Sequence, residues 1–396
     1  FKVKEKFFPY GKHYIDQDDI NAVTNVLKYK KLTQGEEVTK FEEEIAKYVG
    51  SKYAVAVSSW TSGLHISCLT LGVSKGDFVV TSPITFVASS NSVLYCQGTP
   101  IFCDIDNETI NMCPNKLEHI LKKFKVKAVM PVHFSGVSCK MDDINFLSKK
   151  YNFKIIEDAA HALGATHSDG TKVGSCKFSD IAGFSLHPVK SIAAGEGGMI
   201  TTNNENYYKR LIRLRSHGIN KNDDRFLNPN FAFTKGILNP WYYEMQELGY
   251  NYRLTDIQSA LGRSQLKKIQ NFIEKRKNLA LVYDKELETV SNVNPIQSNH
   301  RLTSSHHLYV VRINFDKISI SRAELMVKLR DKGILTQVHY IPILRNPYYS
   351  KHIQKNDSFL NTKNYFNECL SLPLYYELKE DNVKYIVKEL DEILKN

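Results

Sequence analysis

The sequence predicts an α/β protein in which a mostly parallel sheet, covered by helices on both faces, is followed by a smaller C-terminal α/β unit. The length of 396 residues exceeds the usual size of one domain. Between Tyr53 and about Thr202, short apolar, β-branched runs alternate with amphipathic stretches, a pattern typical of parallel strands joined by helices. After Gly198 the pattern changes and longer helical stretches follow.

In the first part of the chain, strands are expected where short apolar runs are bounded by turn residues, and helices where amphipathic stretches lie between them. The expected strands cover residues 54–57, 78–81, 100–104, 128–132 and 154–156. The expected helices cover residues 61–71, 86–95, 115–123 and 142–150. Ligands bind at the carboxyl ends of the strands in such sheets, so a functional site is expected in the loops that follow them.

The later part of the chain is expected to hold helices over 206–215 and 255–288, with a loop rich in Asn, Pro and aromatic residues over 222–241. Strands are expected near 309–313 and 335–339. We find no internal repeat, low-complexity tract or flexible linker. The predicted boundary therefore falls at the start of the long helix: residues 1–255 form a large domain that includes the N-terminal segment, and residues 256–396 form the connecting helix and a small domain.

The composition excludes several classes of protein. Hydrophobic residues make up 42% and charged residues 24% of the chain, as in an ordinary folded protein. No run of about 18 apolar residues occurs, so no membrane partner is expected. The stretch from Phe1 to Lys12 is not laid out like a secretory signal, and the seven Cys are dispersed without a C-x-x-C pair. We therefore expect a cytoplasmic protein with reduced thiols and no metal site.

The net charge of +11 has three possible explanations: a nucleic-acid partner, an anionic small substrate, or a lysine-rich solvated surface. The basic residues are spread along the whole chain, with only short clusters such as Lys122-Lys123 and Lys267-Lys268. No long basic run interleaved with aromatic residues is present. We therefore expect no nucleic-acid partner, and a solvated surface that also attracts a phosphorylated ligand.

One candidate segment, Ser58-Ser59-Trp60-Thr61-Ser62-Gly63, lies between an expected strand and an expected helix. Backbone N–H groups at the start of a helix, with hydroxyl groups nearby, can hold a phosphate. Ser and Thr are also the residues that cap ordinary helices. Considered alone, the segment favours an ordinary cap.

Two further segments contain candidate catalytic residues. Residues 155–161 place Asp158 and His161 at the end of a buried strand, where a carboxylate needs a cationic partner; a protonated pyridine nitrogen is one such partner, and a capping Asp beside a structural His is the alternative. Residues 183–190 place Lys190 in a tight turn after a strand, with three Gly within residues 195–198. A desolvated Lys can lose its proton and attack a carbonyl, although most lone Lys residues are simply solvated.

Together these segments resemble the DegT/DnrJ/EryC1/StrS sugar aminotransferases, which have the fold-type I architecture of pyridoxal 5′-phosphate (PLP) enzymes. The resemblance covers nearly the whole chain. Its central motifs are Glu-Asp-x-x-His at 157–161, Ser-x-His-Pro-x-Lys at 185–190 and Gly-Glu-Gly-Gly at 195–198. Further matching segments are Leu-Thr-Gln-Gly at 32–35, Arg-Ser-His-Gly at 215–218, Leu-Gly-Tyr-Asn-Tyr-Arg-Leu at 248–254, Ile-Gln-Ser-Ala-Leu-Gly at 257–262, Gln-Val-His-Tyr at 337–340 and Leu-Pro-Leu at 372–374.

The resemblance implies PLP as the cofactor and a role for each matching residue. Lys190 would bind the cofactor covalently and move the proton during the exchange of the amine, Asp158 would pair with the pyridine nitrogen, and His161 would lie at the ring. The implied phosphate ligands are Thr61, Ser62 and Ser185, with Asn251 contributed by the neighbouring subunit. A site shared in this way implies a homodimer.

Within the family, the chain is most similar to the PseC-type branch. Its enzymes aminate C4 of a UDP-linked 4-keto-6-deoxy-N-acetyl sugar on the route to pseudaminic acid, with L-glutamate as the donor. A diphosphate substrate also agrees with the basic excess of the chain. The similarity implies a nucleotide-sugar site lined by Tyr10, Leu32, Thr33, Trp60, Gln337, Val338, His339 and Tyr340.

The sequence departs from the family pattern at three positions. Ser58 stands where an Asn is common, Trp60 where a small residue is common, and Ile341 where a Lys is often found. The first two positions belong to the expected phosphate cradle. The third removes a cation that could contact the substrate.

Four alternatives remain open from the sequence. Aminotransferases of the legionaminic acid, bacillosamine or TDP-sugar routes share the motifs, because specificity depends on the shape of the pocket. A DNA-binding regulatory protein would need a helix-turn-helix or a concentrated basic face, and a non-catalytic scaffold would have no use for Lys190. A cysteine desulfurase would need a reactive Cys on a mobile loop; Cys176 and Cys369 lie in suitable loops but lack basic neighbours.

Overall fold

A seven-stranded sheet forms the centre of the molecule. The computed structural model describes residues 7–221, 226–351 and 359–395, and the sheet has the strand order β1-β7-β6-β5-β4-β2-β3. Neighbouring strands run parallel from β3 across to β6, whereas β7 is antiparallel to both β1 and β6. The predicted, mostly parallel sheet is therefore confirmed. The strands are β1 (Tyr53–Val57), β2 (Phe78–Thr81), β3 (Thr99–Phe102), β4 (Val126–Met130), β5 (Lys154–Asp158), β6 (Ile181–Ser185) and β7 (Gly198–Thr202).

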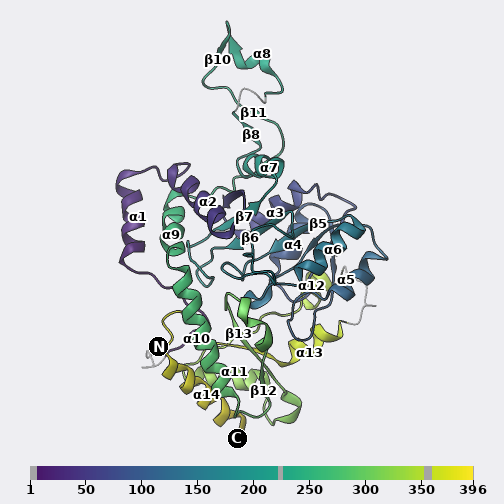
Figure 1. The fold of residues 1–396 in the computed structure, drawn as a ribbon, viewed down its shortest axis with the longest axis vertical. Helices are drawn as coiled ribbons and strands as arrows, with labels where there is room; N and C mark the ends of the chain where they lie inside the picture. Colours follow the sequence, from purple (N-terminus) through teal and green to yellow (C-terminus); the bar gives the residue numbers. More distant parts are fainter. Residues whose placement is uncertain (1–6, 222–225, 352–358, 396) are drawn as a thin grey trace.

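Helices cover both faces of this sheet (Figure 1). Met199 and Ile200 are neighbours on β7 but belong to different apolar cores, because side chains alternate between the two faces of a strand. A sheet buried on both faces needs continuous apolar strands, which is why the short apolar runs of the sequence located it. The surrounding helices are α2 (Glu36–Val49), α3 (Trp60–Thr70), α4 (Ala88–Tyr95), α5 (Pro114–Leu121), α6 (Met141–Tyr151) and α7 (Glu205–Arg215). The four helices expected between the strands and the helix expected over 206–215 are confirmed.

A second, three-stranded sheet lies in the C-terminal part of the chain. Its antiparallel strands are β12 (Val293–Pro295), β13 (Tyr309–Ile313) and β14 (Cys369–Leu372). Helices α10 (Ile269–Leu287), α11 (Arg322–Asp331) and α14 (Glu380–Lys395) share a separate apolar core with it. Phe8 of the N-terminal segment also belongs to this core and pairs with Ile334. The division of the chain at residues 255 and 256 remains a proposal.

Two predicted elements differ in the structure. The long helix over 255–288 is divided into α9 (Asp256–Leu266) and α10. Lys268 lies between them, and its ammonium group contacts the start of α1 (Gln17–Tyr29). Lys268 Nζ is 2.6 Å from Asp16 Oδ1 and 2.8 Å from Asp19 Oδ2. The strand expected over 335–339 is wrong, because only Gln337 pairs, in a single bridge with Ser371. Val338 and His339, which follow Gln337, line a cavity instead of continuing a sheet.

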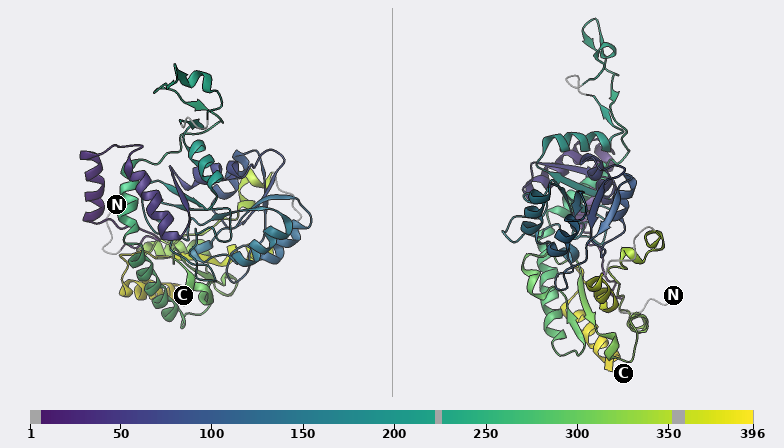
Figure 2. Two further views of the ribbon diagram at one scale, coloured as in Figure 1. Left: turned by 45° about the horizontal axis from the view of Figure 1, so that its top comes forward. Right: turned by 90° about the vertical axis from the view of Figure 1, so that its right-hand side faces the viewer.

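After α7 the chain leaves the body of the molecule as a long arm, which projects in all three views (Figures 1 and 2). Strands β8 (Ile219–Asn220) and β11 (Glu244–Met245) pair at its base. The loop expected over 222–241 instead contains α8 (Pro229–Ala232), β9 (Phe233–Thr234) and β10 (Ile237–Leu238), and residues 222–225 lie outside the described part. Several large apolar side chains of the arm are exposed: Leu227, Phe231, Ile237, Trp241 and Met245.

The remaining elements are short. They comprise α12 (Pro347–Ser350), α13 (Leu360–Glu368) and short 3-10 helices at Phe134–Gly136, Ser298–Thr303, Phe315–Lys317 and Ile343–Arg345. Within the described ranges, no helix combines the length and the apolar character needed to cross a bilayer. The same residues contain no group of three or more His, Cys, Asp or Glu placed to hold a metal ion.

Candidate active site

A cavity of about 700 Å³ lies where the carboxyl ends of the central strands meet the start of α3. Its floor comes from the end of β5 and from residues that follow β2 and β6, including Asp158, Ser89 and Lys190. Residues 337–341, far along the chain, form a wall of the cavity together with Tyr10. The site is thus located where ligands bind in parallel α/β sheets.

Asp158 is the last residue of β5, and its backbone is fixed by the neighbouring segment. Its N–H donates to Pro131 O at 2.9 Å, and its carbonyl accepts from His133 N at 3.1 Å. The carboxylate is 4% exposed. It accepts hydrogen bonds from Trp60 Nε1 at 2.8 Å and from Ser89 Oγ at 2.6 Å. The strand therefore ends in a buried acidic group that borders the cavity.

Lys190 lies in a turn after β6, in which its N–H donates to His187 O at 2.9 Å. Its side chain is partly accessible from the cavity and otherwise surrounded by protein. Burial lowers the pKa of Lys190 to about 8, although the negative charge of Asp158 acts in the opposite direction. A larger fraction of neutral, nucleophilic amine is therefore present near neutral pH than for a solvated Lys.

His161 connects the floor of the cavity with its wall. Its Nδ1 accepts a hydrogen bond from Ser135 N at 3.3 Å, so Nε2 carries the proton and donates to Tyr340 Oη at 2.9 Å. Burial lowers the pKa of His161 well below its ordinary value, and the charges of Lys190 and His339 act in the same direction. The imidazole is therefore neutral, and the Tyr340 hydroxyl is left free to donate into the cavity.

The start of α3 has the expected cap. The Ser59 side chain accepts from Ser62 N at 3.1 Å, and Ser62 Oγ accepts from Ser59 N at 3.1 Å. The first N–H groups of a helix have no partner within it, and Ser59, Trp60 and Thr61 all border the cavity. A Cβ at Gly198 would lie 2.6 Å from Trp60 N, so only glycine lets β7 pack this closely on the start of the helix.

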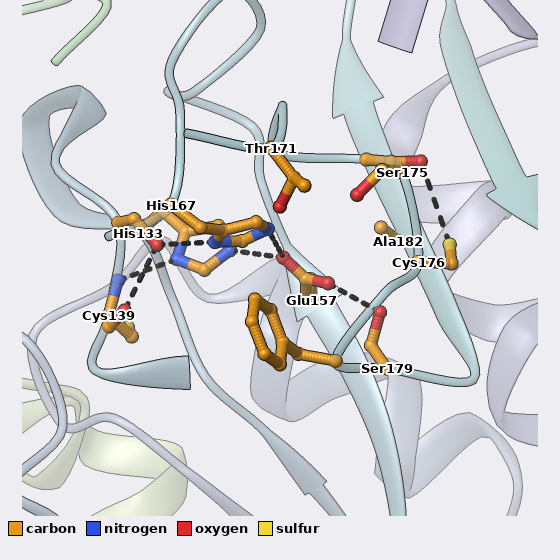
Figure 3. A network of polar contacts seen from close by, with 12 residues as sticks. His133, Cys139, Glu157, His167, Thr171, Ser175, Cys176, Ser179 and Ala182 are labelled. Carbon is orange, nitrogen blue, oxygen red and sulfur yellow. Dashed lines mark hydrogen bonds and ion pairs between the residues drawn. The ribbon is translucent and has the colours of Figure 1, made fainter. Parts of the chain in front are cut away.

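Glu157 precedes Asp158 on β5 but belongs to a closed polar network (Figure 3). It accepts hydrogen bonds from His133 Nε2 at 2.8 Å and from the Ser179 hydroxyl, and His167 Nε2 lies 3.6 Å away. His133 Nδ1 accepts from Cys139 N at 3.0 Å, which makes Nε2 the protonated nitrogen. Burial by itself raises the pKa of Glu157, but the hydrogen bonds from His133 and Ser179 and the electrostatic effect of His133 and His167 together outweigh it, and the pKa lies below its ordinary value.

Most of the residues predicted for the site meet in this one cavity. Those that line it are Tyr10, Trp60, Thr61, Asp158, His161, Ser185, Lys190, Gln337, Val338, His339 and Tyr340. Ser62 is buried in the helix cap rather than open to the cavity. The lining of this cavity does not include Leu32, Thr33 or Asn251, which are exposed on the same chain.

Sequence reasoning missed Thr85, Phe86, Ser89 and His307, which also line the cavity. The first three follow β2 at the carboxyl edge of the sheet, so the position of the expected strand over 78–81 was a usable signal. His307 lacks a comparable signal, because it precedes a strand of the other sheet. Its ring centroid lies 4.4 Å from that of His161.

The two Cys considered for desulfurase chemistry are both buried. Burial raises the pKa of Cys176 to about 12 and that of Cys369 to about 11. A thiol with a raised pKa is a poor nucleophile at neutral pH. Neither residue lines the cavity, so the structure gives no support to that reading.

Comparison with known proteins identifies the class of this site. Residues 13–391 match the DegT/DnrJ/EryC1/StrS aminotransferase family. The chain belongs to this family. It is 38% identical over 387 residues to the UDP-4-amino-4,6-dideoxy-N-acetyl-beta-L-altrosamine transaminase of Campylobacter jejuni strain 81-176, with 97% of each chain covered.

Solved structures agree with this assignment. The fold matches Helicobacter pylori PseC, an aminotransferase involved in the biosynthesis of pseudoaminic acid, with a TM-score of 0.90, 30% identity and coverage of 98% of this chain and 100% of that one. It also matches the PLP-form of the putative sugar aminotransferase Spr1654 from Streptococcus pneumoniae, with a TM-score of 0.85, 25% identity and coverage of 98% and 99%. The architecture is fold-type I, and the protein is a PLP-dependent aminotransferase.

The residues of the cavity fit this cofactor. Asp158 presents a buried carboxylate where a protonated pyridine nitrogen needs a partner, and Lys190 presents an amine with a lowered pKa. Thr61 and Ser185 place hydroxyl groups beside the start of α3, where a phosphate is favoured. The cavity therefore contains a suitable group for each end of the cofactor.

Proposed function

We propose that this aminotransferase moves an amino group from L-glutamate to C4 of a UDP-linked 4-keto-6-deoxy-N-acetyl hexose. The observation that supports the reaction most directly is the presence of Lys190, with its lowered pKa, and Asp158 in one cavity. The choice of sugar is supported by the similarity to the Campylobacter jejuni transaminase over nearly the full length of both chains.

The residues of the cavity would have separate roles in binding the cofactor and in transferring the proton. PLP, when bound, supplies an electron sink that stabilises negative charge on the reacting carbon. Lys190 would hold the cofactor and move a proton between that carbon and solvent. Asp158 would pair with the pyridine nitrogen, His161 would lie against the ring, and Thr61 and Ser185 with the start of α3 would bind the phosphate.

The wall formed by residues 337–341 would contact the sugar nucleotide. Tyr10, Phe86 and Tyr340 offer aromatic surfaces there, and Gln337 and His339 offer polar groups. A cavity of about 700 Å³ is within the range of small-molecule sites. The net charge of +11 would attract a diphosphate from a distance.

A homodimer with shared sites would explain the predicted residues that lie outside the cavity. Asn251, Leu32 and Thr33 are exposed, so a partner subunit could receive them in its own site. The arm after α7 presents exposed apolar residues such as Phe231 and Trp241, and apolar surface of this kind is typical of protein contacts. The seven free thiols agree with a reducing, cytoplasmic setting.

The absorbance spectrum of the purified protein with PLP tests the reaction. A band above about 400 nm is expected, with the cofactor fixed on Lys190 by borohydride and the band lost when L-glutamate is added. The protein that has reacted with L-glutamate should then aminate the UDP-linked 4-keto sugar. The Lys190→Ala variant should neither form the trapped band nor aminate the sugar. A protein that shows no band with PLP, or keeps it in L-glutamate, would refute the proposed reaction.

Mixed dimers test the shared site. Lys190→Ala and Asn251→Ala should each be nearly inactive. Mixing the two should restore part of the activity, since one of the two sites in each mixed dimer has both residues intact. If mixtures stay as inactive as their parents while size-exclusion chromatography shows that the dimers exchange, each site is built from one chain.

A further inference from the structure

We propose that Trp60 is a positioning residue that holds the Asp158 carboxylate through its indole N–H. The acceptor site of the carboxylate that no protein donor occupies is thereby directed toward the cofactor nitrogen. This inference rests on the proposed function, because it assumes that Asp158 pairs with PLP. It also assigns Trp60 to the cofactor side of the cavity, whereas the sequence placed it at the nucleotide sugar.

The hydrogen bonds on Asp158 define which acceptor sites remain. Oδ1 accepts from Trp60 Nε1 at 2.8 Å and from Ala160 N at 3.3 Å. Oδ2 accepts from Ser89 Oγ at 2.6 Å, and Ser89 in turn lies 2.8 Å from Thr85 Oγ1. A carboxylate offers about four acceptor sites. Both sites on Oδ1 are therefore occupied, and one remains on Oδ2.

The indole reaches Asp158 because two glycines leave room for it. A Cβ at Gly63 would lie 2.6 Å from Trp60 Cε3, and a Cβ at Gly183 would lie 2.1 Å from Cζ3. Real Cβ atoms do not approach other atoms this closely, so any other residue at either position would displace the ring. Trp60, which stands where the family commonly has a small residue, thus fits only together with Gly63 and Gly183.

The bond between Trp60 and Asp158 is well suited to fixing the carboxylate. The indole is 5% exposed, and its ring is packed among the apolar residues of the sheet. Hydrogen bonds to a charged acceptor are stronger than neutral ones. Without the indole, Oδ1 would keep only the longer contact with Ala160 N, and the carboxylate could rotate away from the orientation set by Ser89.

Nuclear magnetic resonance can observe the hydrogen bond without changing Trp60. The chain has two Trp, and Trp241 is 73% exposed, so ¹⁵N-Trp labelling gives two indole signals that are easily assigned. The Trp60 proton should be shifted downfield and exchange slowly with solvent. Asp158→Asn should move this signal and leave that of Trp241 in place. An unchanged Trp60 signal in that variant would overturn the proposal.

Trp60→Phe tests the consequence for the cofactor, because it removes the donor and keeps an aromatic ring. We expect PLP to bind about tenfold more weakly, the visible band to shift, and kcat to fall while KM for L-glutamate is nearly unchanged. Ser92→Ala is the matched control: Ser92 is buried on the same helix as Ser89 and bonds to the Ser89 carbonyl, not to Asp158. It should leave the cofactor affinity and the spectrum unchanged.

The outcomes separate the two proposals. Wild-type protein that binds no PLP would refute the proposed function itself. If the wild-type protein binds PLP and Trp60→Phe has the same PLP affinity and absorbance spectrum, only the role of Trp60 is refuted. Equal weakening in Trp60→Phe and Ser92→Ala would assign the effect to general packing and would also refute it.

Discussion

Glu157 and Asp158 are adjacent acidic residues on one strand, yet their surroundings are opposite in kind. Glu157 is fully buried, and its oxygens are directed to His133, Ser179 and His167. Asp158 is 4% exposed and lines the cavity with an acceptor site still free. Successive side chains of a strand point to opposite faces, so one residue step separates a closed network from an open site.

The difference shows how burial and function can be distinguished for a charged group. A buried carboxylate needs hydrogen bonds in either case. What differs is whether the protein supplies all of them. Glu157 is satisfied by the protein and stabilises the fold, whereas Asp158 keeps an acceptor site for a ligand. Substitution of Asp158 should therefore lower turnover, whereas substitution of Glu157 should lower the stability of the fold.

The largest effect is expected from Asp158→Asn. The amide cannot provide the negative charge that a protonated pyridine nitrogen needs, so turnover should fall by about 100- to 1000-fold. The free energy of unfolding of the cofactor-free protein should change little, since the amide oxygen can still accept from Trp60 and the Ser89 hydroxyl can turn to accept from the amide NH2. Steady-state kinetics and urea unfolding together measure both. A variant with normal turnover would show that another group holds the pyridine proton.

Glu157→Gln should have the reverse profile. The amide places a donor where the carboxylate accepted from His133 or Ser179, and the free energy of unfolding should fall by about 2–4 kcal/mol. Glu36→Gln, which alters an exposed carboxylate paired with Lys30 and Lys40, should change stability little. Protein that remains folded should still give the visible PLP band. If Glu157→Gln lost the PLP band while its free energy of unfolding stayed unchanged, the assignment of Glu157 to the stability of the fold would be wrong.

The smallest effect concerns how the rate at which Lys190 reacts covalently with PLP depends on pH. The amine must be neutral to react, and its pKa is lowered to about 8 by burial. Below pH 8 the rate should rise about tenfold per pH unit, and above pH 8 it should level off. Solvated lysines, with a pKa near 10.4, should keep gaining reactivity. Borohydride trapping and peptide mass spectrometry measure both in one sample. A midpoint for Lys190 near 10 would contradict the lowered pKa.

The parts of the fold that depend on local pattern were predictable. Short apolar runs located the first five strands of the large sheet, and the motifs around Asp158 and Lys190 placed both residues at the strand ends. The segment over 335–339 was misread because its apolar residues resemble a strand, although only Gln337 pairs and Val338 lines the cavity. The break between α9 and α10 lies where Lys268 forms ion pairs with Asp16 and Asp19, which are about 250 residues earlier in the chain, so local pattern could not indicate these contacts.

The contacts that organise the site could not be predicted from local pattern. Trp60 and Asp158 are 98 positions apart, and nothing near either residue indicates that they meet. Tyr340 and His161 are 179 positions apart, and their contact depends on how the C-terminal sheet packs. The glycines that accommodate the indole, Gly63 and Gly183, have an evident role only once the ring is placed.

The wall of the cavity is held by a segment that the ribosome makes late. Gln337 pairs with Ser371 through two backbone hydrogen bonds, and Tyr10 O accepts from Leu374 N at 3.1 Å. At about 5–20 residues per second, residue 371 is added roughly 10–40 s after Lys190. During that interval a nascent chain has its catalytic amine but not the wall that would enclose the substrate. The enclosed site can therefore form only after synthesis has passed residue 374.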